Sequence, residues 1–178
     1  QVPFADRHPS VHDAASLELI EPETGSIMTI GTTRAWNLQQ GCRLQWLGPD
    51  FQERVILNDF RDGCLVAVIL DIASGGERVI DRPVYDVAKD GKSALSLDFE
   101  RLHIFRPGYG YDRGQRAEQY DPFPQDDGIW YIDLETGASR LIISLAQIAE
   151  DVGDFGRHIS CTRFNHIMIN PSGNRFMF

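Results

Sequence analysis

Residues 43–81, RLQWLGPDFQERVILNDFRDGCLVAVILDIASGGERVID, decide the fold. Three turn signals, Gly-Pro-Asp at 48–50, Arg-Asp-Gly at 61–63 and Ser-Gly at 74–75, separate four runs rich in apolar and β-branched residues. Because glycine adopts positive φ at little cost, each turn can join two antiparallel neighbours. The stretch therefore predicts a sheet of four meandering strands.

The two hairpin patterns of this stretch recur along the chain. The first is represented by LGPDFQERVILND (47–59), VAKDGKSALSLDF (87–99) and INPSGNRFMF (169–178), and the second by LELIEPETGSIMTI (17–30), VILDIASGGERVI (68–80) and WYIDLETGASRLI (130–142). The two patterns alternate, and a complete pair occupies about 40 residues, which is typical of a four-stranded propeller blade. We therefore expect an all-β chain built from β-propeller blades.

The predicted organisation is a single partial propeller over residues 1–178, with about three blades. It has a half blade at 13–31, a blade at 43–81, a blade at 84–144 with an insertion at 100–127, and a half blade at 165–178. Closed propellers use about four to eight blades, and an open arc leaves edge strands unpaired. Either the missing blades belong to the same chain, giving about seven in all, or a second copy closes the ring. We expect the former, because the chain starts without Met and stops within a predicted strand. A β-sandwich of similar strand count is the alternative fold.

Composition restricts the partners. The chain has 17 basic and 26 acidic residues, a net charge of −9 and 42% hydrophobic residues, so it is globular and lacks a uniformly basic surface. Its longest apolar run, Cys64 to Leu70, is too short to span a bilayer. We therefore expect neither nucleic acid nor membrane as a partner. The three cysteines form no CxxC pair and are compatible with either the cytoplasm or the periplasm.

One face of the predicted propeller carries the long connections. Successive turns of a meander lie at alternate ends of the sheet, and the turns of one class are all short. The other class includes residues 31–42, 100–127 and 145–164. A short helix is expected at 144–151, with Ser144 as its N-cap. Because binding and catalytic groups usually lie on such connections, we expect the site on this face.

Arginine and aromatic residues gather in two of these connections. Residues 31–43 hold two basic residues and no acidic one, and residues 100–116 hold four arginines against two acidic residues. Arginine binds carboxylates in a bidentate manner, and aromatic rings stack on sugars, so an acidic oligosaccharide is the predicted ligand. The candidate substrate-binding residues are Arg34, Trp36, Arg101, His103, Arg106, Tyr109 and Tyr111. Residues 117–127 add four acidic residues, so the alternative is that these charges pair and hold the insertion closed.

Histidines are the other candidates. His158, Cys161 and His166 lie within nine residues of one another but match no strong zinc signature. We expect His158 to be structural. His166 lies just before an innermost strand, where a propeller channel is lined, and either a structural hydrogen bond or contact with a ligand fits that place.

The stretch HIMINPSGNRFMF (166–178) resembles the repeat of bacterial Tol-type propellers and of the seven-bladed oligogalacturonate lyases. AKDGKSALSLDF (88–99) and IDLETGASRLI (132–142) resemble the other halves of those blades, and residues 33–63 and 106–111 are similar to uncharacterised relatives of the lyases. The resemblance implies that His166 and Arg163 act on a uronate as the catalytic residues. It also implies a divalent metal ion held by histidines and a Gln, but this stretch has no His-x-His pair, so no metal ligand is assigned.

Two functions follow from these observations. The first is a carbohydrate-active propeller that binds, and by the resemblance cleaves by β-elimination, an acidic uronate-containing oligosaccharide. The second is a non-catalytic interaction or scaffold module, since propellers host both. Convergence of Arg106, Arg163 and His166 on one place would favour the first function, and mutual pairing of the charges would favour the second.

Overall fold

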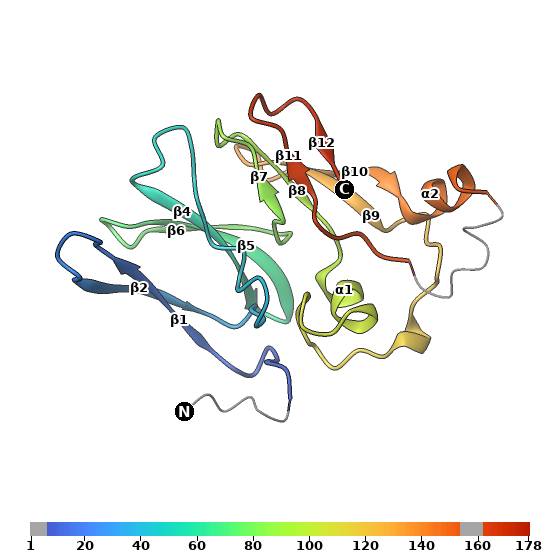
Figure 1. Ribbon diagram of the computed structural model, residues 1–178, viewed down its shortest axis with the longest axis horizontal. Coiled ribbons are helices and arrows are strands. Elements are labelled where there is room, and N and C mark those ends of the chain that lie inside the picture. Colours follow the sequence, from blue (N-terminus) through green and yellow to red (C-terminus); the bar gives the residue numbers. More distant parts are fainter. Residues whose placement is uncertain (1–6, 154–161) are drawn as a thin grey trace.

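The computed structural model describes residues 7–153 and 162–178, and these form mainly antiparallel strands (Figure 1). One four-stranded sheet contains β3 (Gln45–Trp46), β4 (Arg54–Arg61), β5 (Cys64–Asp71) and β6 (Glu77–Ile80); the other contains β7 (Asp86–Val87), β8 (Ser93–Ser96), β9 (Gly128–Asp133) and β10 (Ser139–Ser144). Strands β1 (Ala15–Ile20) and β2 (Ile27–Thr33) form a two-stranded sheet, as do β11 (Met168–Ile169) and β12 (Phe176–Met177). Chain neighbours are sheet neighbours throughout, which confirms the predicted all-β fold of four-stranded blades.

The apolar run of β5 is continuous because both faces of its sheet are covered. On one face Val66 and Val68 pack with Leu17 of β1. On the other face Ala67 packs with Ile132 of β9. Side chains alternate along a strand, so each strand contributes to two separate apolar clusters.

The next sheet repeats this arrangement. Ala94 of β8 faces the β3–β6 sheet, whereas its neighbour Leu95 belongs to a third cluster, against which Ile169 and Phe176 of β11–β12 pack. The four sheets therefore stack in series, with β1–β2 at one end of the fan and β11–β12 at the other (Figure 1). This series of face-to-face sheets is the arrangement of propeller blades and differs from a two-sheet sandwich.

In the described residues, two α-helices lie in the long connections. Helix α2 (Leu145–Asp151) confirms the expected helix, because the Ser144 hydroxyl accepts a hydrogen bond from Gln147 N and the Gln147 side chain accepts one from Ser144 N. Helix α1 (Phe99–Phe105) lies in the insertion and was not predicted. The short 3₁₀ helix η1 (Ala117–Gln119) follows it. No helix in the described ranges is both long and apolar enough to cross a membrane.

Helix α1 forms because Asp98 caps it. The Asp98 carboxylate accepts hydrogen bonds from the backbone N–H groups of Glu100 and Arg101, at 2.8 and 2.9 Å. Phe99 and Leu102, three residues apart, place one face of the helix in the core. The acidic cap followed by this spacing is the signal that predicts a helix here.

Candidate functional site

The connections on the face that carries the long loops form two neighbouring candidate sites. The first lies where the chain enters the inner strands β3, β7 and β11, and we call it the Tyr85 cluster. Its members are Gln40, Arg43, Tyr85, Arg106, Tyr109, Asn165 and His166. The second lies between the two complete blades, and we call it the Arg82 pocket.

Tyr85 holds the first cluster together. Its ring is buried, and its hydroxyl accepts hydrogen bonds from Gln40 Nε2 at 3.1 Å and from His166 N at 2.9 Å. The same hydroxyl donates to Asn165 Oδ1 at 2.8 Å. Because residues 40, 85 and 165 come from three different connections, one phenol fixes all three segments relative to one another.

Arg43 and His166 occupy equivalent positions in the repeat. Arg43 lies four residues before Leu47, and His166 lies four residues before Asn170. The backbone N–H groups of Leu47 and Asn170 each donate the hydrogen bond that closes the turn of an inner hairpin. Arg43 and His166 both adopt left-handed backbone, with φ of 56° and 57°. Such a conformation costs a non-glycine residue about 1 kcal/mol or more, and it is held here by the contacts to Tyr85.

The Arg43 side chain rests on Tyr85. Its guanidinium carbon lies 4.1 Å from the centre of the Tyr85 ring, and Nε donates to the Tyr85 carbonyl oxygen at 2.7 Å. This half-buried guanidinium is therefore already engaged, and its role is to position Tyr85 rather than to meet a ligand directly.

Arg106, Tyr109 and His166 form the accessible part of the cluster. The Arg106 guanidinium carbon lies 4.1 Å above the Tyr109 ring, and the Tyr109 and His166 rings meet edge to face at 6.3 Å. The Tyr109 carbonyl oxygen accepts a hydrogen bond from Asn37 Nδ2 at 3.0 Å, which anchors the loop. Arg106 and His166 are exposed, so three of the residues predicted from the sequence converge on one surface.

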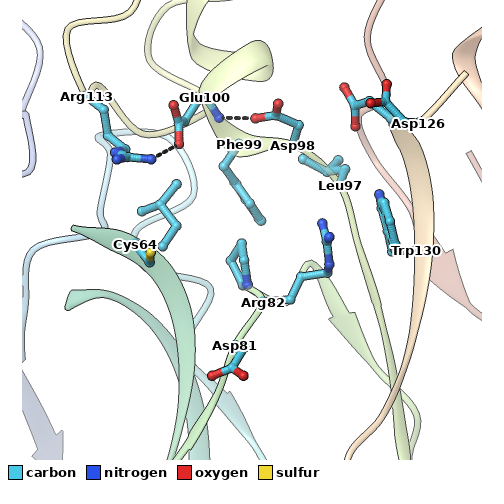
Figure 2. Close-up of a pocket in the computed structure, with 13 residues that line it drawn as sticks. Cys64, Asp81, Arg82, Leu97, Asp98, Phe99, Glu100, Arg113, Asp126 and Trp130 are labelled. Atoms are coloured by element: carbon cyan, nitrogen blue, oxygen red, sulfur yellow. Dashed lines mark hydrogen bonds and ion pairs between the residues drawn. The ribbon is translucent and has the colours of Figure 1, made fainter. Parts of the chain in front are cut away.

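The Arg82 pocket has a volume of about 390 Å³ and lies between the β3–β6 and β7–β10 sheets (Figure 2). The Arg82 guanidinium carbon lies 3.7 Å from the centre of the Trp130 ring. Arg82 Nε is buried without a hydrogen-bond partner among the described residues. Burial lowers the pKa of this guanidinium, and the carboxylates of Asp127 and Asp98 oppose that shift.

Carboxylates dominate the lining of this pocket. Five acidic residues contribute to it: Asp81, Asp98, Glu100, Asp126 and Asp127. Two of them form ion pairs, Glu100 with Arg113 and Asp127 with Arg101. Burial, and next the negative charge of Asp98, raise the pKa of Asp127 from 3.8 to about 6. The pocket therefore disfavours an anionic ligand and favours hydroxyl groups or a cation.

Other predicted site residues have structural contacts. Arg101 is 3% exposed, its Nε lies 2.8 Å from Asp127 Oδ2, and its Nη atoms donate to the carbonyl oxygens of Thr162 and Asp121. Tyr111 is 1% exposed, and its hydroxyl accepts a hydrogen bond from Asn58 Nδ2. Both side chains are enclosed by protein, so neither reaches a ligand in this conformation.

The remaining predicted residues are not among the seven members of the Tyr85 cluster. The Trp36 indole donates to the Asp13 carbonyl oxygen at 2.9 Å, and Arg34 is exposed nearby. His103 Nε2 lies 3.9 Å from Asp112 Oδ2, and burial lowers the pKa of its imidazole. Arg163 is half-buried in the segment that leads to His166. In the insertion, Arg101 and Arg113 thus form ion pairs with acidic residues, whereas Arg106 is exposed.

The described residues do not form a metal site. In residues 7–153 and 162–178, no three His, Cys, Asp or Glu side chains lie close enough to hold an ion. His166 neighbours Tyr109 rather than another histidine. His158 and Cys161 lie outside the described residues. The divalent metal implied by the resemblance therefore finds no fitting ligand set here.

The candidate residues predicted from the sequence do not include Tyr85, Gln40, Arg43, Asn165 or Trp130. A signal for Arg43 exists in the repeat, because aligning residue 47 with residue 170 places Arg43 opposite His166. The pairing of Arg82 with Trp130 joins residues far apart in the chain, and no spacing rule indicates it.

Comparison with known proteins adds little to this geometry. No protein-family model matches the chain, and no curated protein matches it. Among solved structures, the crystal structure of TolB from Acinetobacter baumannii is similar at 17% identity and a TM-score of 0.44, over 70% of this chain. The chain spans 25% of the length of that protein. The fold assignment rests on the strand order of the chain itself.

Proposed function

We propose that this chain binds an acidic, uronate-containing oligosaccharide at the Tyr85 cluster. The observation that carries the proposal is the stack of Arg106 on Tyr109 beside the exposed His166. None of the seven residues of the cluster is acidic. A guanidinium held flat on an aromatic ring keeps its edge available for a carboxylate.

The polar groups of the cluster suit sugar hydroxyls. Gln40 Oε1 and Asn165 Nδ2 are both buried without a hydrogen-bond partner among the described residues. One is an acceptor and the other a donor, and both belong to side chains bound to the Tyr85 hydroxyl. A small shift of these amides toward a hydroxyl group would satisfy both, which supports a polyol ligand.

Cleavage by β-elimination is the finer part of the proposal, and it comes from the resemblance. His166 would accept the proton from the carbon next to the uronate carboxylate, and Arg163 would stabilise the negative charge on that carboxylate. The electron pair would form the new carbon–carbon double bond as the glycosidic oxygen leaves with a proton from water. The product would be an unsaturated uronate.

Calorimetric titration tests binding. Oligogalacturonate should bind the wild-type chain, and its methyl ester should bind at least tenfold more weakly, because the ester lacks the charge that Arg106 recognises. Arg106→Ala should lose the preference for the acid, whereas Lys92→Ala, an exposed cation on the opposite ends of the strands, should keep it. Equal affinity for acid and ester would refute the proposal. Ultraviolet absorbance of the unsaturated product in the same mixtures tests cleavage separately.

The second candidate is a non-catalytic interaction module that uses the Arg82 pocket. Its five carboxylates favour the basic side chain of a protein partner over any acidic sugar. Binding of an arginine-containing peptide that is lost in Asp126→Asn, with no binding of oligogalacturonate, would favour this function instead.

A further inference from the structure

The Arg82 pocket has walls from two neighbouring blades. Cys64 and Leu65 of β5 lie on one side, Trp130 of β9 lies on the other, and the connection from β6 to β7 adds Arg82 between them (Figure 2). The volume of about 390 Å³ is within the range of small-molecule sites, which is about 300 to 1,000 Å³. The pocket can therefore enclose one small ligand.

The protein gives the Arg82 guanidinium no hydrogen-bond acceptor. Among the described residues it has neither a hydrogen bond nor an ion pair, and it rests on the Trp130 ring at 3.7 Å. By contrast Arg113, which lines the same pocket, pairs with Glu100 and donates to the Gly63 carbonyl oxygen. A half-buried guanidinium without acceptors has lost hydration that no protein group replaces. Arg82 is therefore available to a ligand that brings oxygen acceptors.

Two carboxylates of the pocket have acceptor capacity left. Asp98 Oδ1 accepts both hydrogen bonds that cap helix α1, and no described residue donates to Oδ2. Asp126 is exposed and has no ion pair with a described residue. In the view of Figure 2 both carboxylates lie above Arg82, whereas Asp81 lies below it. The donors of a ligand can therefore meet Asp98 and Asp126 while its acceptors meet Arg82.

The charges of the pocket decide the class of ligand. An anion would meet Arg82 but would also face five carboxylates. A cation would meet the carboxylates but would also face Arg82, which already covers one face of the Trp130 ring. A hydroxyl group accepts a hydrogen bond from a guanidinium and donates one to a carboxylate at the same time. A neutral ligand with several hydroxyl groups therefore satisfies both kinds of group, whereas an ion satisfies only one.

Apolar side chains of the pocket favour a sugar ring over a short polyol. Leu65, Leu97 and Phe99 line the same cavity as the charged groups. A pyranose ring carries hydroxyl groups around its edge and C–H groups on its faces, so it can meet polar and apolar walls together. Glycerol has hydroxyl groups but no ring face to place against the apolar wall.

We propose that the Arg82 pocket binds a neutral sugar unit, whose hydroxyl groups bridge the Arg82 guanidinium and the carboxylates of Asp98 and Asp126. This site is separate from the Tyr85 cluster and does not depend on a uronate binding there. It also differs from the second candidate function, which places the basic side chain of a peptide in the same pocket. Arg82 distinguishes these two occupants, because removing its charge weakens a hydroxyl ligand and favours a cation.

Amide NMR titration of the wild-type chain with neutral methyl glycosides tests the proposal. The probes are the methyl glycosides of galactose, glucose, mannose and rhamnose, with glycerol as the short polyol. At least one glycoside should shift the amides of residues 98–100 and 126–130 and the indole N–H of Trp130, and glycerol at the same concentration should not. Absence of these shifts with all four glycosides, or equal shifts with glycerol, would overturn the proposal. Shifts confined to residues 106, 108–110 and 165–167 would place the neutral sugar in the Tyr85 cluster and would overturn it as well.

The variant Arg82→Leu keeps an apolar contact with the Trp130 ring and removes the donors. Affinity for the glycoside should fall by about tenfold or more, because hydrogen bonds to a charged group are lost. Arg140→Leu is the matched control. Arg140 also rests on an aromatic ring of β9, at 4.9 Å from the centre of Tyr131. Because Tyr131 follows Trp130 in the strand, it faces the opposite side of the sheet, and this variant should keep the wild-type affinity.

The opposite response would identify a cation as the occupant. An arginine-containing peptide that shifts the same amides, and that binds Arg82→Leu more tightly than the wild type, would overturn the sugar site in favour of the second candidate function. Asp98→Asn provides a second variant, because asparagine also caps helices and so preserves α1. It should weaken binding of the same glycoside, since an amide oxygen is a weaker acceptor than a carboxylate. Circular dichroism checks the fold of each variant, and unchanged affinity in both would show that the sugar does not bind in this pocket.

Discussion

The Tyr85 cluster and the Arg82 pocket lie on the same face and are built from the same class of connection, yet they have opposite character. In the first, an arginine is stacked on an aromatic ring with no acidic residue in the cluster. In the second, an equally stacked arginine is enclosed with five carboxylates. The comparison shows that an arginine alone does not indicate which ligand a face binds. The charges of the residues around the arginine decide whether the site favours an anion or a cation.

The two regions are joined by one buried amide. Asn58 Oδ1 accepts a hydrogen bond from Val84 N at 2.7 Å, and Nδ2 donates to Val84 O at 2.8 Å. Val84 lies between Pro83 of the pocket and Tyr85 of the cluster. The connection from β6 to β7 is therefore fixed at Val84. The residues before Val84 line the Arg82 pocket, and Tyr85 after it belongs to the Tyr85 cluster.

The largest expected effect comes from removing this link. Asn58→Ala leaves the Val84 backbone groups and the Tyr111 hydroxyl without their buried partner, which should lower the free energy of unfolding by about 3–5 kcal/mol. Both regions should lose their geometry together. Urea denaturation measures the loss, and Gln52→Ala, at an exposed turn position, is the control and should stay within about 0.5 kcal/mol of the wild type. A loss below about 1 kcal/mol would mean that the two regions are independent.

The next largest effect is a pH dependence of stability that arises in the Arg82 pocket and not in the Tyr85 cluster. The pKa of Asp127 is raised from 3.8 to about 6, so the folded chain holds a proton there that the unfolded chain has released. Stability contributed by this group should therefore fall by about 3 kcal/mol as the pH rises from about 4 to above 6. Denaturation at a series of pH values should show this slope.

The slope should disappear in Asp127→Asn and persist in Asp126→Asn, its exposed neighbour in the pocket. Direct titration of the Asp127 carboxyl by carbon NMR checks the assignment. A midpoint near 4 would contradict the view that burial and the charge of Asp98 raise the pKa of this carboxyl.

A smaller effect tests the cluster alone. Tyr85→Phe removes the hydroxyl that binds Gln40, Asn165 and His166 but keeps the ring stacked on Phe99, with centroids 5.9 Å apart. The free energy of unfolding should fall by about 1–2 kcal/mol, and the pKa of Asp127 should stay unchanged. Tyr131→Phe is the matched control. If Tyr85→Phe moved the Asp127 titration, the separation of the two regions would fail.

The fold was largely predictable because its signals are local. Turn glycines and the alternation of apolar residues define each hairpin, and both lie within about ten residues. The continuous apolar run of β5 indicates a strand covered on both faces. Helix α1 was not predicted because its cap Asp98 and its first residue Phe99 fall within the run 87–99, which the repeat pattern assigns to a hairpin.

The site was predictable only in part, for a physical reason. Arg106, Tyr109 and His166 were identified by residue type, and the fold brings them together. Arg101 has the same residue type but is buried against Asp127 and two carbonyl groups. Whether an arginine is paired depends on contacts between distant segments, and neither composition nor spacing records them.

The smallest effect on stability should come with a large effect on binding. Arg106→Ala removes one exposed guanidinium from the Tyr109 ring, which should lower the free energy of unfolding by less than about 1 kcal/mol. Affinity for oligogalacturonate should nevertheless fall at least tenfold. Thermal denaturation measures the stability, and calorimetry on the same sample measures the affinity. If the free energies of unfolding and of binding fell by the same amount, Arg106 would have a structural role.

The central claim is that the Tyr85 cluster, and not the Arg82 pocket, receives the acidic sugar. Amide NMR spectra recorded during titration with oligogalacturonate test it directly, with Arg106→Ala and Arg82→Leu compared with the wild type. We predict shifts of the amides of residues 106, 108–110 and 165–167 that vanish in Arg106→Ala and persist in Arg82→Leu. Shifts confined to the amides of residues 81, 82 and 126–130, lost only in Arg82→Leu, would contradict the claim.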